Sequence, residues 1–104
     1  MIDNHKKDKE RSTLELLDFY AAWCEPCKML DEILENVTNE IGKRLKISKI
    51  DIDQQPQLSA RYAISSVPVL VLLRNGKAVW RMNGFLTAPE LVRIFRGLVQ
   101  KEAS

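Results

Sequence analysis

The sequence predicts a single α/β domain with a four-stranded mixed sheet, helices on both of its faces, and the element order βαβαββα. Segments typical of buried strands alternate with segments whose apolar residues have helical spacing, as in parallel βαβ units. Asn75-Gly76 then stands between two apolar runs, which is the strongest short signal for an antiparallel hairpin. With 104 residues and 45% hydrophobic content, the chain has enough apolar surface for one core but is too short for two domains.

The first half of the chain predicts a βαβ unit and a short helix. Apolar residues of 14–20 occupy both faces of an extended segment, which indicates a buried strand. The next long segment has apolar residues at helical spacing up to Gly42, a natural C-terminal stop. Residues 46–52 are the second predicted strand, and Asp53 is predicted to cap a short helix that begins near Pro56.

The second half predicts a hairpin and a last helix. Residues 69–73 and 78–82 are its two strands, and Gly76 supplies the positive φ that the tight turn needs. The segment 87–90, Thr-Ala-Pro-Glu, has the pattern of a capping box. A helix is therefore expected to start there and to bury its apolar stripe against the sheet.

Composition and charge exclude several classes of protein. Lys and Arg exceed Asp and Glu by only two, with mixed signs along the chain, so neither a nucleic-acid face nor a membrane-binding stripe is predicted. Residues 1–12 form a charged tail without the apolar segment of a signal peptide, which leaves 13–104 as the domain and favours a cytoplasmic location. No transmembrane span is predicted.

Metal and organic cofactors are not expected. A zinc site needs at least three protein ligands, and His5 is the only histidine, so no metal site is predicted. The chain also has no glycine-rich loop of the dinucleotide-binding type. No metal or organic cofactor is therefore expected, and any redox chemistry would come from a redox-active disulfide between the two cysteines of the chain.

The segment Cys24-Glu25-Pro26-Cys27 is the only reactive motif, and it contains both cysteines of the chain. Two cysteines at this spacing can form a disulfide if the backbone brings their sulfurs together. Cys24 is expected at the exposed start of a helix, where free N–H groups and the helix dipole favour a thiolate, so it is the candidate nucleophile. Cys27, one turn later and more covered, is the candidate resolving thiol. The alternative is a pair of inert buried cysteines.

The chain resembles the thioredoxin family over about residues 14–99. The matching segments are 17–29 (LDFYAAWCEPCKM), 49–53, Val67-Pro68, Asn75-Gly76 and Gly84. This ordered set is much more specific than a C-x-x-C motif alone, which metal sites also use. The resemblance implies the thioredoxin fold, disulfide oxidoreductase activity, and a cis peptide bond between Val67 and Pro68.

The chain departs from the family pattern at three places. Most thioredoxins have glycine where Glu25 stands, and many have a helix-kinking proline at the position of Glu32. Too few residues precede Leu14 for the usual opening strand and helix, so the N-terminal region is expected to be shortened. Glu25 places a carboxylate beside the Cys24 thiolate, and we expect this redox-tuning residue to make the protein a stronger reductant than glycine would.

Asp18 shares a strand face with Leu16 and Tyr20 and is expected to be buried, which is costly for an unpaired carboxylate. The resemblance implies that Asp18 transfers a proton to or from the resolving thiol and that Lys49 is its charged neighbour. A structural hydrogen bond or a buried ion pair is the alternative for Asp18. For Lys49 the alternative is a solvated lysine at a strand end.

A substrate-docking surface is expected beside the cysteines. Its candidate residues are Trp23, Pro26, Val67, Gly84 and Phe85. The cis bond that the resemblance implies at Pro68 would aim the backbone of Val67 at an incoming peptide, which could pair with it like an added strand. Pro68 could instead simply open a strand, and Tyr20 could belong either to this surface or to the core.

The function expected from these features is reduction of protein disulfides by a monomer that a separate thioredoxin-reductase-like protein recharges. One alternative keeps the fold but reverses the direction, giving a disulfide oxidase or isomerase of an oxidising compartment. Another is a thioredoxin-fold binding module with incidental redox activity. A complete cysteine pair with Asp18 and Pro68 beside it is more than docking alone would need.

Overall fold

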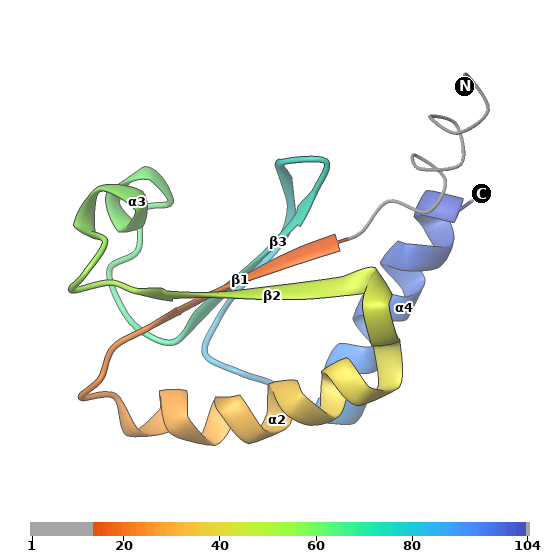
Figure 1. Cartoon of the computed structure of the whole chain (residues 1–104), viewed down its shortest axis with the longest axis horizontal. Coiled ribbons are helices and arrows are strands. Elements are labelled where there is room, and N and C mark those ends of the chain that lie inside the picture. The colour runs from red at the N-terminus through yellow and green to blue at the C-terminus, as the bar shows by residue number, and fades with distance from the viewer. Residues whose placement is uncertain (1–13, 104) are drawn as a thin grey trace.

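The computed structural model describes residues 14–103 and contains the predicted four-stranded mixed sheet (Figure 1). Along the chain, the elements are β1 (Leu14–Tyr20), α2 (Glu25–Ile41), the 3-10 turn η1 (Gly42–Arg44), β2 (Leu45–Asp51), α3 (Pro56–Arg61), β3 (Val69–Arg74), β4 (Lys77–Asn83) and α4 (Ala88–Ala103). The predicted tail, 1–12, and His5 within it lie outside the described residues.

The strand order is β2-β1-β3-β4. β1 is parallel to β2 and antiparallel to β3, and β3 is antiparallel to β4. β1 therefore lies inside the sheet, and its two faces are both covered, which explains why its sequence has apolar residues on both sides. Its C-terminal end leads directly into the loop before α2.

Helices cover both faces of the sheet, as predicted. On one face, Leu16 of β1 is in one core cluster with Leu34 of α2 and Phe95 of α4. On the other face, Phe19 packs near Tyr62, which follows α3, with ring centroids 5.6 Å apart. Figure 1 shows α2 and α3 on opposite sides of the strands. The cysteine motif thus lies where the central strand β1 leads into α2.

Gly42 ends α2, and Asn75-Gly76 forms the turn between β3 and β4, as the sequence predicts. Gly42 is the C-cap of α2 with φ of 81°, which a residue with a side chain rarely adopts. Asn75 and Gly76 both have positive φ, 53° and 83°, as a tight hairpin turn between β3 and β4 requires. The predicted strand 46–52 is observed one residue earlier, as β2.

The capping box before α4 is confirmed, but the predicted Asp53 cap of α3 is wrong. The backbone N–H of Thr87 donates to Oε1 of Glu90 at 3.0 Å, and the N–H of Glu90 donates back to Oγ1 of Thr87 at 3.4 Å. The N-cap of α3 is Gln55, without a side-chain cap bond. Asp53 lies two residues before that position, too early to reach the free N–H groups of α3.

Candidate active site

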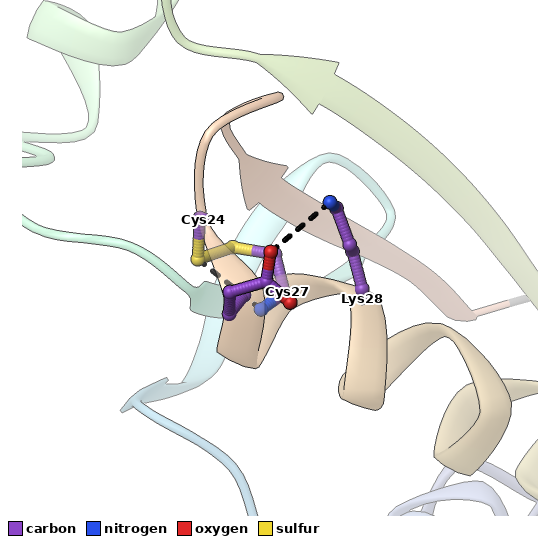
Figure 2. Close-up of polar contacts among 4 residues, drawn as sticks. Cys24, Cys27 and Lys28 are labelled. Atoms are coloured by element: carbon purple, nitrogen blue, oxygen red, sulfur yellow. Dashed lines mark hydrogen bonds and ion pairs between the residues drawn. A yellow bond between two sulfur atoms is a disulfide. The ribbon is translucent and has the colours of Figure 1, made fainter.

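Cys24 and Cys27 form a disulfide at the start of α2 (Figure 2). Their Cα atoms are 5.3 Å apart, within the usual range for a disulfide. Cys24 is the N-cap residue of the helix, and its Sγ accepts a hydrogen bond from the backbone N–H of Cys27 at 3.1 Å. Pro26 lies in the first turn, where its missing N–H removes no helical hydrogen bond.

The two sulfur environments differ in hydrogen bonding rather than in exposure. Cys24 and Cys27 are each only 4% exposed, so the expectation of an exposed Cys24 and a more covered Cys27 is wrong for this disulfide form. Both cysteines pack in a small cluster with Ala21 and the partly buried Val67. The cluster, with Val67 packed against it, accounts for the low exposure of both cysteines. What singles out Cys24 is its place at the helix N-terminus.

Two separate segments border the cysteines. The Val67-Pro68 peptide bond is cis, as the resemblance implied, and Val67 packs against the cysteine cluster. The N–H of Gly84 donates to the carbonyl oxygen of Pro68 at 2.8 Å, which brings the end of β4 to the same place. Phe85 follows and is 37% exposed.

Trp23 and Pro26 are both exposed beside the disulfide, as expected of a docking surface. The indole of Trp23 is fixed, because its Nε1 donates to Oδ2 of Asp53 at 3.0 Å. Sequence reasoning assigned Asp53 to a helix cap and missed this contact, which joins residues 30 positions apart. Tyr20 is half-buried and packs against the cysteine cluster, so it belongs partly to the core and partly to the surface beside the cysteines.

Asp18 is fully buried, as predicted, with 1% of its surface exposed. Neither of its carboxylate oxygens has a hydrogen-bond partner among the described residues. The alternative of a structural hydrogen bond is therefore not realised. Burial raises the pKa of Asp18 to about 6; the positive charge of Lys49 opposes the rise, and the negative charge of Asp31 adds to it.

Lys49 is opposite Asp18 in the register of β1 and β2, but its ammonium group pairs with another residue. Nζ of Lys49 lies 2.9 Å from Oδ1 of Asp31 in α2 and 4.5 Å from the ring centroid of Tyr20. Burial lowers the pKa of Lys49, but the hydrogen bond and charge of Asp31, helped by Asp18, outweigh it and raise that pKa. Sequence reasoning missed Asp31, because it predicted no contact between this helix position and Lys49.

Glu25, the main departure from the family pattern, has a partner that the sequence reasoning also missed. Its Oε2 lies 3.2 Å from Nζ of Lys28, one helical turn later, and both side chains are exposed. The carboxylate therefore stands at the first turn of α2 with a positive charge beside it. Three-residue spacing on a helix is the signal that could have identified the pair.

The part of the chain that the structure describes contains no metal-holding group of side chains and no membrane-spanning helix. Within residues 14–103, no three His, Cys, Asp or Glu side chains are grouped so that they could hold a metal ion. None of the described helices is both long and apolar enough to cross a membrane.

Comparison with known proteins identifies relatives along most of the chain. The family model described as Thioredoxin matches residues 3–96. The thioredoxin of Bacillus subtilis is 43% identical over 70 residues, which cover 67% of this chain and 67% of that protein. The thioredoxin of Chlamydia trachomatis is 40% identical over 87 residues, which cover 84% of each protein.

Solved structures show the same fold. Chloroplastic thioredoxin z superposes with a TM-score of 0.76 at 33% identity, over 95% of this chain and 89% of that one. The germline-specific thioredoxin Deadhead of Drosophila melanogaster gives a TM-score of 0.75 at 30% identity, over 94% of this chain and 93% of that one. The four-stranded sheet and the disulfide at the start of α2 agree with these matches. The chain therefore belongs to the thioredoxin family.

Proposed function

We propose that this thiol–disulfide oxidoreductase reduces disulfides in other proteins by dithiol–disulfide exchange. The observation that carries the proposal is the Cys24–Cys27 disulfide with Cys24 as the N-cap of α2. The N–H of Cys27 and the positive end of the helix stabilise negative charge on Sγ of Cys24. A thiolate at this sulfur is the species that attacks a disulfide.

The proposed reaction has two exchanges. In the reduced protein, the Cys24 thiolate attacks one sulfur of the substrate disulfide; that bond breaks, and the other substrate sulfur leaves as a thiolate and takes up a proton. Cys27, deprotonated, then attacks Sγ of Cys24 in the mixed disulfide and releases the second substrate thiol. The substrate gains two electrons and two protons, and the protein becomes the Cys24–Cys27 disulfide. A separate reductase of the thioredoxin-reductase type would return the two electrons.

Asp18 is proposed to take the proton of Cys27 before the second exchange. A carboxyl group with a pKa of about 6 is partly protonated near neutral pH, so it can both accept and release a proton there. Its two oxygens have no hydrogen-bond partner among residues 14–103, which leaves both free to exchange protons. Lys49, on the neighbouring strand, is proposed to act on Asp18 only through its positive charge, because its ammonium group pairs with Asp31.

The substrate is proposed to dock on the surface around the disulfide. Trp23, Pro26 and Phe85 supply exposed apolar surface there, and Gly84, which has no side chain, lies beside the Val67-Pro68 segment. The backbone of Val67, next to the cis peptide bond at Pro68, is proposed to pair with an extended substrate segment. We propose that the protein acts as a monomer in the cytoplasm and that its substrates are disulfide-containing proteins.

A redox titration against glutathione combined with a protein-disulfide reduction assay tests this function. We expect a potential close to the thioredoxin value of about −270 mV and catalytic turnover with a reductase present. A potential near the protein disulfide isomerase value of about −180 mV would instead favour an oxidase or isomerase. A strongly reducing pair without turnover of any protein disulfide would favour a binding module.

A further inference from the structure

Four charged residues from three elements line one surface pocket of about 240 Å³. Asp18 comes from β1, Lys49 from β2 and Asp31 from α2. Glu35, one turn after Asp31 on the same helix, also lines the pocket. The pocket therefore connects a buried carboxylate with an exposed ion pair.

Lys49 has two acidic neighbours and pairs with only one of them. Its Nζ donates to Oδ1 of Asp31 at 2.9 Å, whereas neither oxygen of Asp18 accepts a hydrogen bond from any described residue. Yet Asp18 and Lys49 are direct register partners on adjacent parallel strands. The ammonium group of Lys49 is therefore paired with Asp31 of α2 rather than with Asp18, its register partner on the neighbouring strand.

Burial explains why this arrangement is favoured. The side chains of Lys49 and Asp31 are 44% and 46% exposed, so their ion pair keeps much of its hydration. Asp18 is 1% exposed, and an ammonium group drawn to it would lose water that the surface pair retains. The face of Tyr20, 4.5 Å from Nζ, further stabilises Lys49 where it is.

We propose that Asp31 is a positioning residue, which holds the ammonium group of Lys49 at the surface end of the pocket and leaves the carboxylate of Asp18 unpaired. Asp31 disfavours ionisation of Asp18 in two ways. Its own negative charge disfavours ionisation of Asp18, and by holding Lys49 it withholds the cation that would favour ionisation. Removing the charge of Asp31 is therefore expected to make Asp18 a stronger acid.

Few charged groups surround Asp18, so the effect of each on its ionisation can be tested separately. β2 contributes Lys49, and α2 contributes Asp31 and Glu35. From β3, the residue opposite Asp18 is the apolar Leu70. The residues of α4 that are buried in the adjoining core are also apolar: Leu91, Val92, Phe95 and Val99. Tyr20, in β1 itself, contacts Lys49 through its ring.

The test is the titration of the Asp18 carboxyl carbon by NMR in the oxidised protein, which needs no catalytic activity. We expect Asp31→Asn to lower the pKa of Asp18 by about one unit, the small end of the effect of a nearby opposite charge. Glu35→Gln is the matched control, because it removes a negative charge from the same pocket but no contact with Lys49. It is expected to cause a much smaller shift.

A double-mutant cycle separates the positioning effect from the direct charge effect. In a Lys49→Met background, Asp31→Asn is expected to lower the pKa of Asp18 clearly less than in the parent, because no cation remains to be released. Equal shifts in both backgrounds, an unchanged Asp18 in Asp31→Asn, or an equal shift in Glu35→Gln would overturn the inference.

Only the catalytic consequence rests on the proposed function. If Asp18 relays the Cys27 proton, the acidic limb of the turnover–pH profile should move to lower pH in Asp31→Asn together with the NMR titration. A shifted titration with an unmoved profile would support the positioning role of Asp31 and contradict the proton relay. The two proposals therefore fail separately.

Discussion

The indole Nε1 of Trp23 donates a hydrogen bond to Oδ2 of Asp53 at 3.0 Å, and so fixes the residue before Cys24 to the loop after β2. Trp23 is 67% exposed, so packing alone does not hold its ring. The hydrogen bond gives the proposed docking surface an aromatic side chain that is held in place. An aromatic group already in place loses less conformational freedom when a substrate binds.

Asp53→Ala is accordingly expected to weaken binding of protein substrates. Ordering the freed indole when a substrate binds would cost about 1 kcal/mol, which corresponds to about a fivefold rise in KM. Asp53→Asn retains an acceptor oxygen and serves as the control. Reduction of a small-molecule disulfide, which needs no docking surface, should be unchanged. Equal losses with small and protein substrates would show that Asp53 supports the cysteine chemistry rather than docking.

The ion pair between Glu25 and Lys28 leads to a prediction about reduction potential. The carboxylate opposes the Cys24 thiolate, whereas the neighbouring ammonium group offsets part of its charge. We expect Lys28→Gln to make the protein more reducing and Glu25→Gln to make it less reducing. Both groups are well exposed, so each change should be worth about 1 kcal/mol or less, or about 20 mV.

Redox titration of the parent, both single variants and the double variant measures these shifts. High salt should shrink all of them, because exposed charges are screened. The parent should lie between the two single variants. A Glu25→Gln protein that is more reducing than the parent would contradict the charge argument.

Asp18→Asn is predicted to stabilise the protein and to slow its turnover. The rise of the Asp18 pKa from 3.8 to about 6 means that the ionised carboxylate destabilises the fold at neutral pH. The upper limit of this cost is about 3 kcal/mol, and the variant should recover part of it. Chemical denaturation at pH 7 measures the stability. A large loss of stability with unchanged turnover would make Asp18 a structural partner.

The same pKa fixes the sign of a pH effect on stability. Between pH 4 and 6 the folded protein holds the Asp18 proton more tightly than the unfolded chain does. The contribution of Asp18 to the free energy of unfolding therefore falls as pH rises through this window and is lowest above it. Asp18→Asn should lack this component, so its stability advantage over the parent should grow from pH 4 to pH 6 and then level off.

Local signals in the sequence were sufficient for most of the fold. Asn75-Gly76 and Thr87 with Glu90 each specify a backbone conformation within a few residues, so the hairpin and the start of α4 were predictable. The shift of register between Leu72 and Leu73 was not, because a β-bulge depends on how two strands fit together.

The site was predictable where one short segment carries the chemistry, as in the cysteine pair. The contacts of Asp53 with Trp23 and of Asp31 with Lys49 join residues far apart in the chain, and no periodicity encodes them. For the same reason, the equal burial of the two cysteines could not be foreseen. Residues from distant segments, Ile52 and Val67, pack against the cysteine cluster.

The division of roles between Cys24 and Cys27 is tested most directly by alkylation of the reduced single variants at pH 7. Cys24 is the N-cap of α2 and accepts the N–H of Cys27, so its thiolate should be the more stabilised one. We expect the thiol of Cys27→Ser to react at least about tenfold faster than that of Cys24→Ser. Cys27→Ser should also accumulate as a mixed disulfide with substrate, and Cys24→Ser should not reduce substrate at all. Equal alkylation rates in the two variants would contradict the assignment of Cys24 as the nucleophile.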